Sequence, residues 1–448
     1  MKSTMICIVV IVIVCSIGNG VFAAEKRIAS FEEVFQNQGL CLDHPDMLLK
    51  IGLDILVRDA VLHHPSVTAK QLELTSAQAS VESAKWGFFP TPSITREQVS
   101  AKKNDPTYGA GTNQQTTLAL NQSIWTWGRL TATKDHAEAL AQANVIAISE
   151  QREMLADQVF TSFAEWMRAY KQLALTEKYI DIHQQLYEQS ERRIASGVTA
   201  QIDRELTLGR LRQLQVDRAR LKASRSSALH RLSQLVGHTL NEETMADFPE
   251  SVLCVPGANE YLDSAASRNL TLARLNSNIK AQDADIESRK AARFPEIYAR
   301  MERDYGAYGS SGNTPYNRVF IGFNYQTGAG LSINSDIAAL VAHRDATVDD
   351  IHASKLVLLD QLNSEWLNYQ TLNEQRKATE QSLSNAIAVK ESYERQYQAG
   401  RKSWLDVMNM VREQLQLELQ MAEIDSSLIT QSRSLYLHAS GIANWGIE

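Results

Sequence analysis

The chain has 448 residues and a formal net charge of −7, from 45 lysines and arginines against 52 aspartates and glutamates. A charge this mild argues against nucleic acid as the partner. The first 23 residues are typical of a secretory signal peptide, with Lys2, an apolar run from Met5 to Ile17, and small residues before the cleavage site. That run is too short to span a membrane comfortably. We therefore expect the mature chain to work outside the cytoplasm.

No later stretch is apolar enough for a transmembrane helix. An exported chain of this kind is either a soluble protein or a β-barrel protein. Two cysteines, Cys41 and Cys254, remain after the signal peptide, and each precedes the first helix of one half of the chain. An oxidising compartment favours a disulfide between them. Two buried free thiols are the alternative.

The mature sequence repeats its landmarks at a distance of about 200 residues, which is too long a period for a solenoid. The repeat predicts two similar halves that pack side by side. We divide the chain into an N-terminal segment 24–52, a first repeat 53–237, a linker 238–259, a second repeat 260–441 and a tail 442–448.

Each half begins with a predicted helix, at about 53–85 and about 260–293; from Thr68 to Lys85 alanine and glutamine are frequent and glycine is absent, which suits a helix. Proline then follows, and apolar and polar residues alternate on both sides of a loop rich in Gly, Asn and Pro. This texture predicts one strand hairpin per half, at about 90–127 and about 295–326. The chain would therefore supply four strands.

After Gly128 the pattern becomes helical up to Ser196, and a matching stretch runs from about 337 to 398. Apolar residues recur there at close to the coiled-coil period, and the first stretch would be roughly 100 Å long at the α-helical rise. Each long helix ends at a glycine, Gly197 or Gly400, and a second helix returns. Thr199 and Ser403 are the predicted N-caps of the returning helices. The hairpin tips are placed at about 193–204 and about 396–407.

The predicted fold class is mainly α with membrane β. Four strands are too few to close a membrane barrel, and open sheet edges are not tolerated in lipid. The chain must then pool its strands with copies of itself, and three copies give twelve strands. A periplasmic coiled-coil scaffold without a pore is the alternative, and it leaves the matched hairpins of the two halves unexplained.

The ordered set of helix, proline, strand hairpin, glycine and long helix, present twice with its paired Gly-x5-Asp turns, resembles the TolC-type outer-membrane efflux proteins over essentially the whole mature chain. The resemblance implies a homotrimer with a 12-stranded outer-membrane β-barrel, continued by a long periplasmic α-helical barrel. It also implies a periplasmic adaptor protein and an inner-membrane transporter as partners, besides the lipid of the outer membrane.

The resemblance also assigns a gate at the hairpin tips. In the family pattern, a tyrosine and a basic residue of the second tip bond the aspartate of the first tip; those positions are Tyr397, Lys402 and Asp203 here. Lysine cannot form the two-pronged bond of the arginine found in the pattern, so we expect a looser link. Solvated turn residues, with Asp203 capping its own helix, are the local alternative.

Asp406 matches a carboxylate that lines the narrowest point of the tunnel in the family. Three copies would form an acidic ring that favours cations. Asn409 stands where the pattern has a second aspartate, so the ring should carry less negative charge. An ordinary acid at a helix N-terminus is the alternative. The turns that we expect to dock the adaptor contain Arg193, Gly197, Thr199, Arg395, Gly400 and Ser403.

The sequence contains no arrangement that predicts catalysis, a cofactor or a metal site. His63 and His64 lack metal-ligand spacing to any other His or Cys. The resemblance implies a passive exit channel of a tripartite export system. Many drug-efflux members of this family are lipoproteins, so the resemblance together with the lack of a good lipidation motif favours type I protein secretion with an ABC-type transporter. Efflux of drugs or other small molecules is the alternative.

Overall fold

In the computed structural model, the described residues are 52–100, 114–196, 201–242, 245, 257–306, 316–326 and 332–442. All of them belong to one unit, Asp43–Glu448. The predicted signal peptide, nearly all of the segment 24–52, most of the linker and the tail lie outside these residues. So do Cys41, Cys254, Gly197 and Thr199, and the predicted disulfide is therefore untested.

The two halves of the described chain carry the same elements in the same order. The first half contains α2 (Gly52–His63), α3 (Pro65–Trp86), β1 (Thr91–Gln98), β2 (Gln114–Trp125), α4 (Arg129–Ala195) and α5 (Gln201–Val236). The second half contains α7 (Ala258–Arg268), α8 (Leu270–Ala291), β3 (Glu296–Tyr305), β4 (Tyr316–Asn324), α9 (Ile333–Gln398) and α10 (Trp404–Ser440). The prediction of long helices around one strand hairpin in each half is confirmed.

The first helix of each half is divided in two, which the sequence analysis did not predict. In the first half the break falls at His64, whose side chain accepts a hydrogen bond from the backbone nitrogen of Ser66 at 3.2 Å. Pro65 disfavours helical geometry in the residue before it and suits the first turn of a new helix. In the second half Asn269 caps α8 by accepting from the backbone nitrogen of Leu272 at 2.9 Å.

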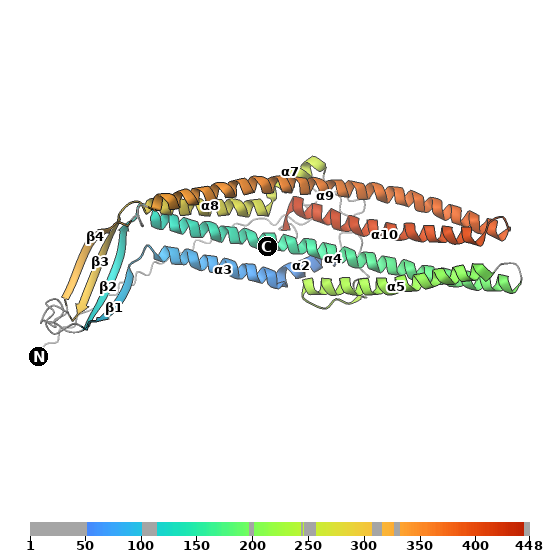
Figure 1. Cartoon of the computed structure of the whole chain (residues 1–448), viewed down its shortest axis with the longest axis horizontal. Helices are drawn as coiled ribbons and strands as arrows, with labels where there is room; N and C mark the ends of the chain where they lie inside the picture. Colours follow the sequence, from blue (N-terminus) through green and yellow to red (C-terminus); the bar gives the residue numbers. More distant parts are fainter. Residues whose placement is uncertain are drawn as a thin grey trace, which may run out of the picture. The chain divides into compact units, whose positions relative to one another are not determined.

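The four strands form one antiparallel sheet in the order β1-β2-β3-β4, so the hairpins of the two halves lie next to each other (Figure 1). Leu118 pairs with Ile94 on one side and with Arg303 on the other, and Met301 pairs with Val319. The ladder between β2 and β3 is irregular between Ser123 and Trp125, close to where β2 leaves the sheet for α4.

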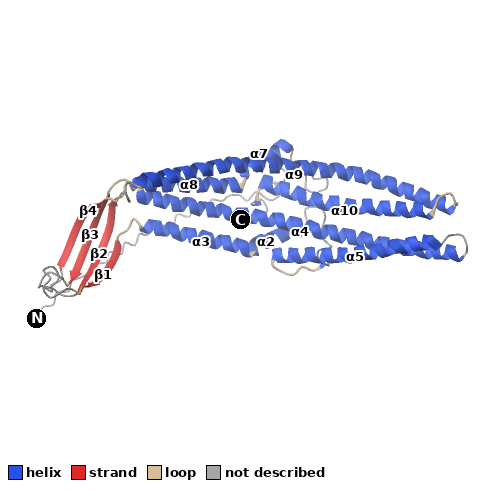
Figure 2. Cartoon of the chain, in the orientation of Figure 1, coloured by secondary structure: helices blue, strands red, loops and turns tan. Residues whose placement is uncertain are grey.

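The helices extend from one end of the sheet, with α4 at the centre of their packing (Figure 2). Helix α4 packs against α3, α5, α8 and α10, and α9 packs against α8 and α10. The largest core lies where α2, α4, α5 and α10 meet, around the fully buried Phe160, Trp166, Leu232 and Leu437. Burial of side chains this large supplies much of the stability of such a fold.

No helix in the described ranges has both the length and the apolar content needed to cross a membrane.

Candidate functional site at the helix ends and on the sheet

The ends of the two helical hairpins, α4–α5 and α9–α10, meet around one hydrophobic cluster. We call it the tip core. All four helices contribute to it, so the two halves of the chain are joined at this end. The tip core consists of Tyr179, Leu214, Tyr397, Trp404, Val407, Met408, Val411 and Leu415.

Trp404 makes a buried polar contact between the two tips. Its indole nitrogen donates a hydrogen bond to the hydroxyl of Thr207 on α5 at 2.9 Å, and that hydroxyl donates in turn to the carbonyl of Asp203 at 2.8 Å. Trp404 is 3% exposed and Thr207 is fully buried. A hydrogen bond this well shielded from water is costly to leave unmade. The pair is therefore a specific link between the first-half tip and the second-half tip.

Tyr397 stands at the end of α9 and packs between two partners. Its ring lies 5.1 Å from the Trp404 ring, centroid to centroid, and the guanidinium carbon of Arg193 lies 4.5 Å from its centroid. The second contact is a cation–π interaction between the two halves. Arg193 and Tyr397, both singled out from the sequence, are therefore brought together by the fold.

The predicted bonds from Asp203 to Tyr397 and Lys402 are absent from the hydrogen bonds and ion pairs formed among the described residues. The amine of Lys402 lies 4.1 Å above the ring of Tyr393 instead. The Asp203 side chain is half-buried, and burial raises its pKa above the usual aspartate value. Within one copy of the chain, the tips are joined through Trp404 and Tyr397 rather than through the Asp203 carboxylate.

The second tip turns at Gly400 and restarts at Ser403. Gly400 has a φ of +73°, in the left-handed region where a side chain is strained, and its nitrogen donates to the carbonyl of Tyr397 at 3.0 Å. The carbonyl of Arg395 accepts from the nitrogen of Ala399 at 3.1 Å and closes the last turn of α9. Ser403 then caps α10 by accepting from the nitrogen of Asp406 at 3.2 Å, which confirms its predicted role as an N-cap.

Asp406 completes this cap from the other side. Its carboxylate accepts from the nitrogen of Ser403 at 3.1 Å and from the hydroxyl at 2.8 Å, so the two residues form a capping box. The hydrogen bonds from Ser403, with a smaller contribution from the charge of Lys402, lower the pKa of Asp406. Asp406 and Asn409 are both half-exposed, so a helix-capping role and exposure to solvent coexist at Asp406.

The sheet has two chemically different faces. One face is apolar and exposed in a single copy of the chain: Val319 is 67% exposed and Ile321 is 78% exposed. On this face the pairing rows place Leu120 beside Met301 and Ile297 beside Phe323. The opposite face carries polar and charged residues. The alternation of apolar and polar positions is clearest on β3 and β4, and it is the pattern of a sheet with lipid on one side and water on the other.

Aromatic side chains mark the boundary between the sheet and the helices. Trp127 stacks on Phe294 of the other half at a centroid distance of 4.8 Å, and its indole nitrogen donates to the carbonyl of Pro295 at 2.9 Å. Trp86 and Phe89 pack at 5.3 Å in the first half. Aromatic residues that are apolar at one end and polar at the other suit a membrane–water interface.

Two residues that carry the site were missed by sequence reasoning. Thr207 follows Asp203 by one helical turn, and Trp404 follows the Ser403 cap directly. One signal in the sequence could have indicated Trp404: it is a large aromatic residue at the first position of a helix that begins directly after a tight turn. The distance between the two residues in the chain hid their contact.

Solved structures of outer-membrane proteins share this fold. A structure of CusC, described in connection with transmembrane channel formation, matches with a TM-score of 0.75 and 16% identity, over 88% of this chain and 93% of that one. The outer membrane protein VceC from Vibrio cholerae matches with a TM-score of 0.74 and 19% identity, over 88% of this chain and 97% of that one. The fold is thus that of the outer-membrane channel proteins.

The family model for the outer membrane efflux protein matches residues 56–238 and 261–440. The chain therefore belongs to the outer membrane efflux protein family. This membership agrees with the predicted location in the outer membrane with a periplasmic helical part, and with a channel protein rather than an enzyme.

Two curated relatives, from two strains of Pseudomonas putida, match a shorter stretch. The probable efflux pump outer membrane protein SepC and the toluene efflux pump outer membrane protein TtgF are each 26% identical over 159 residues. The match covers 35% of this chain and 32% of each relative, so the chain matches about a third of their length.

Proposed function

We propose that the protein is the outer-membrane exit duct of a tripartite export system and that it works as a homotrimer. The observation that carries this proposal is the two-faced sheet. Among the described residues its two outer strands, β1 and β4, are each paired on one side only. In lipid, such edges need partners, and a sheet of four strands cannot close on itself. Joining β4 of one copy to β1 of the next closes a barrel of twelve strands.

The helices continue this duct into the periplasm, with the hairpin ends as the gate. The buried link from Trp404 to Thr207 holds the two tips of one copy together. Opening would require a partner protein to separate them. In this proposal Tyr397 helps to hold the tips together through its contacts with Trp404 and Arg193. Lys402 contributes through its contact with the ring of Tyr393. The Asp203 carboxylate, which has no side-chain partner among the described residues, is available to a cation of a neighbouring copy.

Three copies of Asp406 would form the acidic ring at the inner end. Because Ser403 lowers the pKa of Asp406, the ring would stay ionised at physiological pH. Asn409, one turn further along α10, would add a polar but uncharged position. A ring of this kind favours cations over anions.

The cargo that fits best is a small molecule. The names of the two curated relatives describe efflux pumps, and one of them names toluene. This favours the efflux alternative over the protein cargo expected from the missing lipidation motif. The partners would be a periplasmic adaptor, docked at the tip turns, and an inner-membrane pump. An ABC-type transporter was expected only together with type I protein secretion. We therefore propose that type of pump only for the case in which the cargo is a protein.

Conductance in planar lipid bilayers tests the duct. The purified mature protein should insert and give discrete, long-lived steps, and Trp404→Ala should raise the open fraction because it removes the link between the tips. Leu405→Ala changes an exposed neighbour and is the matched control. Protein that stays in solution without detergent and never inserts would contradict the duct and leave the periplasmic scaffold.

A second experiment separates the two cargo classes. The chain would be expressed together with its adaptor and its pump in a host strain from which the host's own efflux channels have been deleted. Restored tolerance to toluene supports small-molecule efflux. Unchanged tolerance, together with export of a protein bearing a type I secretion signal, would support protein cargo instead.

A further inference from the structure

The polar face of the sheet carries a charged cluster that runs along β3 and β4 from the middle of the strands to the end away from the helices. The cluster is built from two arginines and two acids, Arg300, Arg318, Glu302 and Asp304. Because β3 leaves α8 at Glu296, its later residues lie at the far end of the sheet. The pairing register sets Asp304 beside Tyr316 and Glu302 beside Arg318, so these residues share one face.

Ion pairs fix both arginines to the acids. One nitrogen of Arg318 contacts Asp304 and lies 3.3 Å from the Glu302 carboxylate, and the Nε of Arg300 lies 3.0 Å from the same carboxylate. Asp304 also accepts hydrogen bonds from Thr117 at 2.5 Å and from Gln115 at 3.3 Å, both on β2. The network therefore spans three strands, and Asp304 is held from β2 on one side and from β4 on the other.

The acids and the arginines of this network differ in exposure. The Asp304 side chain is fully buried and that of Glu302 is 10% exposed, whereas those of Arg300 and Arg318 are 40% and 44% exposed. The carboxylates are therefore covered, and the part that faces open space is cationic. This asymmetry gives a network of zero formal charge a positive surface.

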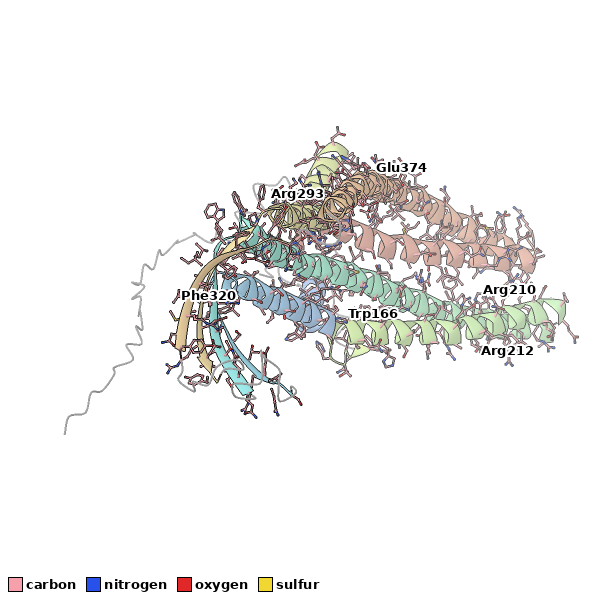
Figure 3. The ribbon with its side chains drawn as sticks, turned by 60° about the vertical axis from the view of Figure 1, so that its left-hand side comes forward. Trp166, Arg210, Arg212, Arg293, Phe320 and Glu374 are labelled. Atoms are coloured by element: carbon pink, nitrogen blue, oxygen red, sulfur yellow. The ribbon has the colours of Figure 1, made fainter. Side chains whose placement is uncertain are left out.

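Aromatic rings support the exposed guanidiniums. The guanidinium carbons of Arg300 and Arg318 lie 5.0 Å and 5.6 Å from the ring centroid of Phe320, which Figure 3 labels on β4, and that of Arg318 lies 5.0 Å from the Tyr316 ring. Planar guanidinium groups stack on aromatic faces in a way that lysine does not reproduce. We call Arg300, Arg318, Tyr316 and Phe320 the guanidinium belt.

We propose that the guanidinium belt is an anion-selecting filter in the outer half of the barrel, and that it binds aromatic carboxylates or sulfonates as they leave the duct. The inference rests on the proposed function, because the polar face lines the bore only in a closed barrel. Three copies would place two guanidiniums each around one ring, and arginine rings select anions in other pores. The ring would also give an aromatic anion both a counter-charge and a surface to stack on.

The filter lies at the opposite end of the duct from the proposed Asp406 ring and has the opposite sign. Cations are favoured where cargo enters, and anions are held where it leaves. The net ion selectivity of the channel would then be the outcome of two opposing filters. Removing the outer filter should therefore expose the preference of the inner one.

The reversal potential under a KCl gradient across a planar bilayer tests the proposal. Arg300→Gln with Arg318→Gln should raise the permeability ratio of K⁺ to Cl⁻ by about twofold or more. Naphthalenesulfonate added on the outer side should block the wild-type steps and lose most of that block in the variant. Arg303→Gln is the matched control, because Arg303 belongs to the same strand but to the apolar face, in the row of Leu118.

Loss of Arg318 leaves the buried Asp304 without its cation, so this variant can fail to fold. Two further variants keep the test decisive. Arg318→Gln combined with Asp304→Asn removes both charges of the pair, and Phe320→Leu keeps all charges but removes the stacking surface. The first should shift ion selectivity, and the second should weaken naphthalenesulfonate block alone.

The outcomes are distinguishable. If wild-type steps are seen and the belt variants leave both selectivity and block unchanged, the filter is wrong and the duct stands. If Arg303→Gln shifts selectivity as much as the belt variants do, selectivity depends on the total charge of the protein and not on the position of the arginines. The filter proposal is then also wrong. If the wild-type protein gives no steps, the duct itself fails.

Discussion

The Nε2 atom of His438, on α10, lies 3.2 Å from the Asp157 carboxylate on α4. On the other side of the imidazole, Nδ1 lies 3.0 Å from Glu365 on α9, which also accepts a hydrogen bond from the Tyr261 hydroxyl at 2.8 Å. Burial alone lowers the pKa of His438, but the hydrogen bonds and charges of the two acids outweigh it and raise the pKa to about 10. One charged histidine therefore joins the first half of the chain to the second.

His438→Ala should destabilise the protein by about 3 kcal/mol at neutral pH, because it leaves two partly buried carboxylates without their cation. The stabilising effect of a raised histidine pKa is complete below the unfolded value of 6.5 and is lost as pH rises towards about 10. The difference in apparent melting temperature between wild type and variant, in detergent, should shrink over that range. A difference that stays constant up to pH 10 would show that His438 acts by packing alone.

Glu153 lies beside the same cluster. An ion-paired acid usually has a lowered pKa and makes the protein more stable as pH rises, and we expect Glu153 to have the opposite effect on stability. Burial raises the pKa of Glu153 to about 7, against smaller effects of the His438 charge and of a backbone hydrogen bond at Ile442. The folded state therefore keeps a proton that the unfolded state loses, and stability falls as pH rises from about 4.5 to about 7.

Glu153→Gln should remove that loss. We expect the variant to lie close to the wild type at pH 5 and to be more stable at pH 8, by about 3 kcal/mol at most, since the pKa rises from 4.5 to about 7 and one pKa unit corresponds to 1.36 kcal/mol. Apparent melting temperatures at the two pH values check this expectation. The exposed Glu138 on the same helix, changed to Gln, is the matched control. Equal gains at both pH values would contradict the titration of Glu153.

The link between Trp404 and Thr207 should appear as an energetic coupling between the two tips. Trp404→Phe keeps the ring but removes the donor, and we expect a cost of about 1 kcal/mol. Thr207→Val removes the hydroxyl and should cost a similar amount. The double variant should lose less than the sum of the two, because each single change already breaks the same bond. Melting temperatures with additive losses would show that the two side chains act independently.

Pattern and turn chemistry were enough to predict the architecture. Alternation around a loop gave both strand hairpins, and the apolar stripe along Leu155, Val159 and Phe163 gave the long helix that is observed. The cap at Ser403 was also predictable, because it is a local interaction three residues long. The breaks at His64 and Asn269 were missed because a sustained helical composition hid the local cap of each.

The contacts of the site were less predictable, because they join residues that are distant in the chain. Most of α5, the helices α7, α8 and α9, and the whole second strand hairpin lie between Thr207 and Trp404 in the chain. The roles of Asp203 and Lys402 were assigned by resemblance, and the fold pairs Lys402 with Tyr393 through its ring. A flexible lysine can contact either of two nearby partners. The choice depends on how the surrounding side chains pack, and the order of residues in the chain does not show that packing.

The final prediction concerns the proposed Asp406 ring. The experiment must separate the effect of the Asp406 charge on ion selectivity from its effect on the stability of α10. Asp406→Asn keeps a side-chain acceptor for the cap and removes the charge, so it should lower cation selectivity in bilayers while the melting temperature stays near that of the wild type. Asn409→Asp should raise cation selectivity, because it adds a second carboxylate one turn along α10. Because Ser403 lowers the pKa of Asp406, cation selectivity should persist on acidification past the range in which an ordinary aspartate titrates, and fall only below it. If Asp406→Asn lowers stability but leaves selectivity unchanged, Asp406 is a capping residue and lines no constriction.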